Sequence, residues 1–178
     1  MSICHIFIPT KHFLIKLNMA NYKRIFLNGY SYFITIVTHQ RNPVLIDNID
    51  LLRESFLVSK RKYNYNIDEI VILPDHFHMI ISPEVASEYP KIIRAVKYHF
   101  SKHLESKSYA HLTQSSSRWR RGSKAVWQKR YYEHTIRDEK DFREKCQYMY
   151  NNPVKHDYTE FAEDWHYSSF FQKTIKNT

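Results

Sequence analysis

A single proline divides the longest strand-like run of this chain and limits how its middle can fold. The run occupies residues 68–82, with Pro74-Asp75 inside it. Proline has no N–H group to donate inside a sheet, and Pro-Asp is typical of a turn. We therefore predict two strands, 68–73 and 76–82, that pair as a hairpin with this turn at its tip.

One strand and one helix are expected before the hairpin. Residues 30–38 are rich in aromatic and β-branched side chains, which is typical of a well-buried strand. Residues 47–62 carry apolar side chains at helical spacing, and either Asp47 or Asn48 can cap the helix that they predict.

The part of the chain after the hairpin predicts two helices and one further strand. A helix opens at Pro90, a fourth strand lies within residues 126–137, and a last helix runs from its N-cap Asp138 to about Asn151. Pro153 follows as a helix stop. The order predicts an α+β fold of the ferredoxin-like split βαβ type: an antiparallel four-stranded sheet with helices on one face, plus a C-terminal helix.

The amino-acid composition indicates which kinds of ligand this protein is suited to bind. The formal net charge is +9 and the pI about 9.4, which favours a polyanion such as nucleic acid, although a merely soluble basic protein has the same balance. The chain has two glycines, too few for a glycine-rich phosphate loop. Cys4 and Cys146 form no CxxC pair, so a zinc ribbon is not expected and a reducing cytoplasm is the default location.

The length of 178 residues fits one domain. The apolar stretch at residues 3–8 is too short to span a bilayer and lacks the features of a signal peptide. Met19 begins a more regular sequence, so we expect residues 1–18 to be an accessory extension and 19–178 a single domain with a C-terminal tail. An added strand or arm is the alternative for the extension.

His76 and His78 are two residues apart in the second strand of the hairpin. Side chains alternate faces along a strand, so both imidazoles point the same way and Phe77 points to the opposite, core side. Two imidazoles on one face can bind a divalent cation. The alternative is a surface pair in which one histidine caps the turn.

Tyr148 and Asn152 are four residues apart near the end of the last helix. This spacing predicts that both face away from the apolar stripe of that helix, where a nucleophile can meet a substrate. Asn152 precedes a proline, which can take its backbone out of the helix. Other tyrosines compete for the role of nucleophile, namely Tyr131, Tyr132 and Tyr150.

A basic stretch at residues 118–130 contains no acidic residue. Trp119 and Trp127 lie within it, and cations beside aromatic rings suit single-stranded nucleic acid. A solvated loop is the alternative for its serine-rich half. The cations concerned are Arg118, Arg120, Arg121, Lys124, Lys129 and Arg130.

Several motifs in a fixed order resemble the His-hydrophobic-His (HUH) single-tyrosine transposases, and more narrowly the REP-associated tyrosine transposases of bacteria. The likeness spans about Tyr22 to Phe171. Its motifs are YKRIF at 22–26, LPDHFH at 73–78, WQKRYYEHTIR at 127–137, NPVKH at 152–156 and WHYSSF at 165–170.

The resemblance implies a role for each matched residue. Tyr148 would be the nucleophile, and His76, His78 and Asn152 would hold a magnesium or manganese ion. Members of the family cut single-stranded DNA near hairpins, which makes a hairpin of REP-like palindromes the expected partner, and a monomer is favoured over a dimer. The expected DNA contacts are Lys23, Arg24, Lys97, Arg118, Arg120, Arg121, Lys129, Arg130, Arg137 and Lys155.

Two departures from the family pattern concern the end of the last helix. Asp157 stands where the family usually has glycine, and Asn151 replaces a residue that is usually apolar or aromatic. Neither change removes a catalytic group. Two other functions remain as alternatives: a catalytically silent nucleic-acid-binding protein on the same fold, and a metal nuclease that uses activated water.

Overall fold

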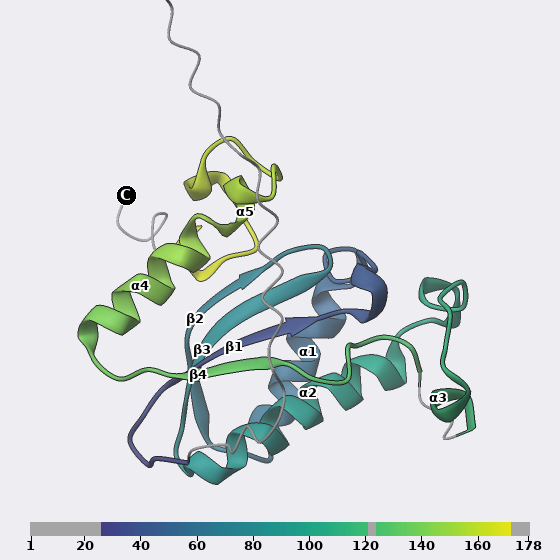
Figure 1. Cartoon of the computed structure of the whole chain (residues 1–178), viewed down its shortest axis with the longest axis horizontal. Coiled ribbons are helices and arrows are strands. Elements are labelled where there is room, and N and C mark those ends of the chain that lie inside the picture. Colours follow the sequence, from purple (N-terminus) through teal and green to yellow (C-terminus); the bar gives the residue numbers. More distant parts are fainter. Residues whose placement is uncertain (1–25, 121–123, 172–178) are drawn as a thin grey trace, which may run out of the picture.

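A four-stranded antiparallel sheet forms the centre of the molecule (Figure 1). The computed structural model describes residues 26–120 and 124–171, apart from the side chains of Arg118 and Trp119. The expected extension, residues 1–18, lies outside this part. The strands, in the spatial order β2-β3-β1-β4, are β1 (Tyr32–Val37), β2 (Tyr65–Ile72), β3 (His76–Pro83) and β4 (Tyr132–Thr135).

The helices follow the predicted order, with two short ones added. The order along the chain, β1-α1-β2-β3-α2-β4-α4, confirms the ferredoxin-like split βαβ fold. Sequence reasoning predicted neither α3, which lies in the serine-rich part of the chain before Trp127, nor α5. The helices are α1 (Ile49–Lys60), α2 (Tyr89–His103), α3 (Ser116–Arg120), α4 (Glu139–Tyr150) and α5 (Asn152–Lys155).

The hairpin of β2 and β3 is confirmed, with Pro74-Asp75 between the strands. The Leu73 N–H donates to the His76 carbonyl at 2.8 Å and closes the turn. β2 begins at Tyr65 rather than at the predicted residue 68, because residues 65–67 also pair with β3 before a register shift.

The residues predicted to begin α4 and α2 are confirmed, whereas the predicted cap of α1 is not. Asp138 caps α4 by accepting a hydrogen bond of 2.8 Å from the Asp141 N–H, as predicted. Pro90 lies in the first turn of α2, also as predicted. Asn48 occupies the N-cap of α1, but its amide donates to the Val44 carbonyl instead of capping the helix.

The sheet separates two apolar clusters. On one face Ile34, Phe77 and Met79 are buried against α1 and α2. On the other face Phe33 and Ile80 pack with Met149 and with partly buried side chains of α4 and the C-terminal segment, namely Phe142, Cys146, Trp165 and Phe170. Figure 1 shows α4 and α5 on one side of the sheet and α1 and α2 on the other.

The C-terminal segment folds back onto the sheet. The Trp165 indole N–H donates to the Ile72 carbonyl at 2.8 Å, and the Ile72 N–H donates to the Tyr167 carbonyl at 2.8 Å. In the described part of the chain, no helix combines the length and the apolar character that crossing a membrane requires.

Candidate active site

The two histidines of β3 share the face that α4 covers. Phe77 between them is buried in the cluster under α1 and α2, so the predicted alternation is confirmed. His76 and His78 are themselves buried, each 3% exposed, and their ring centroids lie 5.0 Å apart. The alternative of a surface pair is therefore wrong.

Each imidazole is held through its Nδ1 atom. His76 Nδ1 lies 2.5 Å from Asp75 Oδ1, and His78 Nδ1 lies 2.8 Å from the Thr35 hydroxyl. Nε2 is the ring nitrogen that remains on each histidine, and His78 Nε2 is buried without a hydrogen-bond partner. A ligating histidine is commonly oriented in this way, with one nitrogen bonded to protein and the other presented to a metal.

Asp75 is an ionised carboxylate that orients His76. Arg41 donates to Asp75 Oδ2 at 2.8 Å, and Thr38 fixes the Asp75 carbonyl through its N–H and its hydroxyl. Burial alone would raise the pKa of Asp75, but the hydrogen bonds and charges of His76 and Arg41 outweigh burial and lower the pKa to about 2. The turn of the hairpin is thus part of the site.

Asn152 enters the site where the last helix breaks. α4 ends at Tyr150 and Asn152 begins α5, so it is no longer on the helix of Tyr148, and Pro153 opens α5 instead of following a helix end. Asn152 is 0% exposed, and neither atom of its amide has a hydrogen-bond partner. A buried unpaired amide costs about 1–3 kcal/mol, a cost that a group bonded to this amide would offset.

The environment keeps His78 neutral at physiological pH. Burial is the main cause, the charges of His76 and His156 add to it, and the pKa falls to about 3. The Asn152 amide faces the ring and opposes this lowering in part. A neutral imidazole is the form that binds a metal.

Tyr148 lies edge-on against His78. Its ring centroid is 5.1 Å from that of His78 and 6.1 Å from that of Phe33, while 41% of the residue is exposed. The predicted orientation, opposite the apolar stripe of α4, is wrong: the side chain flanks the stripe and reaches the sheet. Lys155 Nζ lies 5.4 Å from the centre of the Tyr148 ring and adds a positive charge beside the phenol.

The competing tyrosines have other surroundings. The Tyr150 hydroxyl donates to Glu163 at 3.0 Å, and Tyr131 packs against the cluster under α1 and α2. Tyr132 is on β4, with its ring 6.2 Å from Phe33. Of the four candidates, Tyr148 is the one whose ring contacts a histidine of the pair.

The donor set fits a divalent cation that keeps open coordination positions. Two imidazoles and one amide converge here, and His78 and Asn152 carry buried polar atoms that lack partners. Among residues 26–120 and 124–171, no three His, Cys, Asp or Glu side chains gather as a complete metal-binding group. Further ligands would have to come from substrate and water, as in catalytic metal sites.

Comparison with known proteins decides the family. Residues 27–152 match the family model described as "Transposase IS200 like". The chain belongs to this transposase family. It is 38% identical over 154 residues to a Haemophilus influenzae protein named as a REP-associated tyrosine transposase, with 85% of this chain and 86% of that protein covered.

Two further relatives support the same family. An Escherichia coli K12 REP-associated tyrosine transposase is 31% identical, covering 89% of this chain and 87% of the relative. A solved structure of a REP-associated tyrosine transposase bound to a REP hairpin superposes with a TM-score of 0.71 at 28% identity, covering 89% and 87%. The chain is thus a transposase of the HUH type, a class of DNA-cleaving enzymes that use a divalent metal.

The predicted DNA contacts of this transposase do not form one cluster. Lys155 lies beside Tyr148, whereas Lys97 and Lys129 line a groove next to α2. α3, which carries Arg120, lies far from α4 in Figure 1. Arg130 is exposed, but it does not line the groove as its neighbours Lys129 and Tyr131 do. Lys23, Arg24 and Arg121 lie outside the described residues, as does the side chain of Arg118.

Trp127 is not available to stack on bases, contrary to the prediction. It is buried, its ring packs on Phe100 and Phe77, and its indole N–H donates to the Lys97 carbonyl at 3.1 Å. Trp127 therefore anchors the basic stretch to α2 rather than presenting a ring to nucleic acid.

Sequence reasoning missed a clamp at the start of α4. The buried Asp141 carboxylate accepts from His134 Nε2 at 2.7 Å and from the N–H and Nε of Arg137, both at 3.1 Å. Burial alone would raise the pKa of Asp141, but these donors lower it to about 2. The clamp ties β4 to the helix that carries Tyr148, and it already engages Arg137, one of the predicted DNA contacts.

Proposed function

We propose that this transposase cleaves single-stranded DNA beside a hairpin with Tyr148 as the nucleophile, and that His76, His78 and Asn152 hold the metal. The observation that carries the proposal is the contact of the Tyr148 ring with His78 at 5.1 Å, beside buried His78 and Asn152 atoms that lack partners. The solved relative that binds a REP hairpin supports a hairpin of REP-like palindromes as the DNA partner.

The chemistry is a transesterification that balances without ATP. The Tyr148 oxygen bonds to the scissile phosphorus while the bond to the 3′ oxygen breaks. The tyrosine proton leaves, and a proton restores the released 3′-OH, so a 5′-phosphotyrosine and a free 3′-OH result. A 3′-OH of another strand can reverse the step and rejoin DNA.

The residues of the chain have separate tasks in this step. Asp75 and Thr35 fix the ring orientations of His76 and His78, so Nε2 of each histidine serves as ligand together with the Asn152 oxygen. A magnesium or manganese ion, when bound, supplies Lewis-acid polarisation of the phosphate. Lys155 adds a positive charge beside the nucleophile and the incoming phosphate.

End-labelled oligonucleotides test the proposal. The protein is incubated with a single-stranded REP-like hairpin labelled at either end, with manganese or with EDTA, and run on a denaturing gel. We expect the 3′ label to move with the protein and the 5′ label to appear on a shorter free strand, with manganese only. Tyr148→Phe should abolish the adduct, and Tyr150→Phe, a matched change on the same helix, should retain it.

The alternatives give different results. A silent binding protein would retain the oligonucleotide without any adduct in wild type or variant. A metal nuclease that uses water would cut equally well after Tyr148→Phe and would leave neither label on the protein. We also propose that the protein acts as a monomer in the cytoplasm. A measurement of its mass in solution tests the monomeric state.

A further inference from the structure

A basic groove lies on the side of the sheet opposite the histidines. It has a volume of about 630 Å³ and runs between α2 and the segment 124–131 that leads into β4. We call it the α2 groove, and it is lined by Arg94, Lys97, Tyr98, Lys102, Lys124 and Lys129 among others. Its lining on α2 recurs at helical spacing, next to the buried side of that helix.

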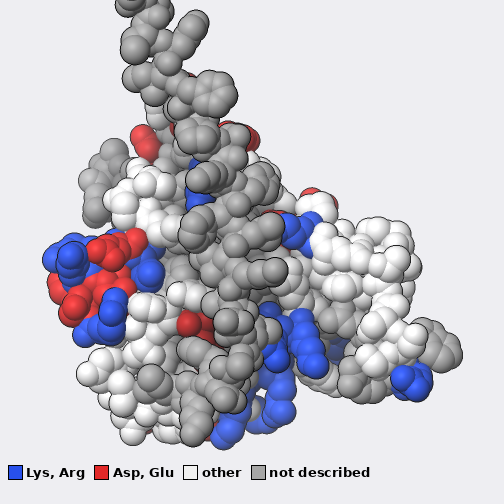
Figure 2. Space-filling model, viewed as in Figure 1, with Lys and Arg blue, Asp and Glu red and all other residues white. Residues whose placement is uncertain are grey.

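The charges of the α2 groove have one sign. Five of its lining residues are Lys or Arg and none is Asp or Glu. On α4, in contrast, positive and negative side chains alternate, and Arg143 pairs with Glu139 at 3.2 Å. Figure 2 shows the difference: red and blue are mixed over α4, whereas the blue patch near α2 contains little red. A one-sign groove attracts a polyanion.

The walls of the α2 groove are fixed by internal bonds. Lys97 Nζ donates to the Gln128 carbonyl at 2.9 Å and Lys124 Nζ donates to the Lys102 carbonyl at 3.0 Å, so both lysines join α2 to the opposite wall. Arg94, Lys102 and Lys129 remain exposed to solvent. A preformed groove binds without first having to be ordered.

An exposed aromatic ring lies in the α2 groove. Tyr98 is 67% exposed on α2, between the cations of that helix. An exposed ring among cations can stack on an unpaired base while the cations contact phosphates. A base pair inside a duplex offers no free face for such stacking, except at its ends.

The α2 groove and the candidate active site meet across the edge strand β4. Tyr131 lines the groove, whereas the adjacent Tyr132 turns to the other face, where its ring lies 6.2 Å from Phe33 beside Tyr148. Successive side chains alternate faces, so the start of β4 borders both sites. A strand that crosses this edge can occupy both at once.

We propose that the α2 groove binds the unpaired DNA strand that flanks the hairpin and leads it across β4 to Tyr148. This inference rests on the proposed function, since it takes its ligand from that reaction. The groove supplies affinity for the strand, and the histidine site supplies chemistry.

Fluorescence anisotropy of the full chain tests the groove. A labelled single-stranded dT20 oligonucleotide and a blunt 20-base-pair duplex are titrated in EDTA, over a range of salt concentrations. Arg94→Gln with Lys102→Gln removes two exposed groove cations. Arg53→Gln with Lys60→Gln removes two exposed cations of α1 that do not line the groove, and is the matched control.

We expect the groove variant to bind dT20 at least about fivefold more weakly than the control, with a salt slope reduced by about 1.4. Tyr98→Ala, which keeps the charge, should weaken dT20 binding about tenfold. Equal losses in the groove and control variants, or a loss confined to the duplex, would overturn the inference. Adduct formation in manganese is measured in a separate experiment. A wild type that forms no adduct would contradict the proposed function. Normal dT20 binding by the groove variants would contradict the role of the groove.

Discussion

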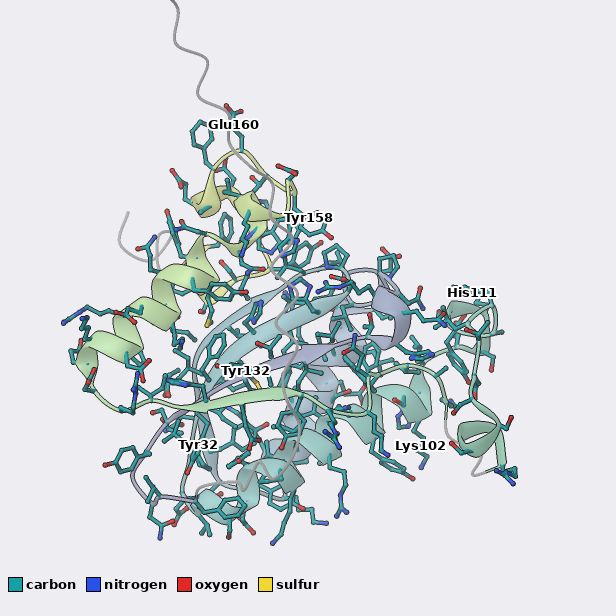
Figure 3. All side chains as sticks on the ribbon, in the orientation of Figure 1. Tyr32, Lys102, His111, Tyr132, Tyr158 and Glu160 are labelled. Atoms are coloured by element: carbon teal, nitrogen blue, oxygen red, sulfur yellow. The ribbon has the colours of Figure 1, made fainter. Side chains whose placement is uncertain are left out.

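The two faces of the sheet bury different kinds of side chain. The face under α1 and α2 is filled with apolar residues such as Phe77, Met79 and Phe100. The face under α4 has apolar packing too, but it also buries His76, His78 and Asn152. His78 and Asn152 carry buried polar atoms that lack a hydrogen-bond partner. One face therefore contributes stability, and the other gives up part of that stability to hold groups that a ligand can complete. Figure 3 draws the side chains of the described residues on the ribbon, with Tyr132 of β4 labelled.

The largest expected effects on stability come from exchanging polar and apolar residues between the two faces. Met79→Gln places an unpaired amide in the apolar face and should lower the free energy of unfolding by about 3 kcal/mol. Asn152→Leu removes an unpaired amide from the other face and should raise it by about 1 kcal/mol while abolishing adduct formation. Urea unfolding measures both, and equal losses in the two variants would contradict the distinction.

The orientation of His78 depends on a single hydroxyl. Thr35→Val keeps the volume but removes the partner of His78 Nδ1, so the manganese-dependent cleavage rate should fall by about 10- to 100-fold. Thr135→Val, on β4 of the same sheet, is the matched control and should stay within about twofold. Rates are measured at limiting manganese, and a normal rate in Thr35→Val would show that the hydroxyl has no orienting role.

Asp141 connects α4 to β4 through its bonds to His134 and Arg137. Asp141→Asn should destabilise the fold by about 2 kcal/mol because it weakens charge-assisted bonds from His134 and Arg137. The folded-state pKa of about 2 lies below the usual value of 3.8, so the contribution of this carboxylate is present above about pH 4 and is lost as pH falls toward 2. Asp50→Asn at an exposed site is the control. Unfolding at several pH values checks whether the variant loses less stability in acid than wild type.

The smallest expected effect concerns the backbone after α5. Asp157 has a φ of 57°, in the left-handed region where glycine has no steric penalty. Asp157→Gly should therefore raise the free energy of unfolding by about 0.5 kcal/mol, since the relief of strain exceeds the entropy cost of glycine. A loss of stability on this change would show that the aspartate makes a compensating contact.

The hairpin and the shared face of the two histidines could be predicted from local rules, because strand alternation and a Pro-Asp turn depend on neighbours in sequence. The split βαβ fold followed from the order of the elements along the chain. The partner of His78 could not be predicted: Thr35 lies 43 residues away and meets His78 only through the register of β1 and β3. The clamp of Asp141 likewise depends on a tertiary contact. Asp157 shows the converse, because its left-handed backbone gives a physical reason for the glycine of the family pattern.

Manganese-dependent stabilisation tests the central claim most directly. If His76, His78 and Asn152 hold the metal, saturating manganese should raise the free energy of unfolding of wild type, by about 2.7 kcal/mol at 100 times Kd. His78→Gln should lose this increase, whereas His111→Gln, at an exposed site, should keep it. An equal increase in wild type and His78→Gln would contradict the account, since the metal would then bind elsewhere.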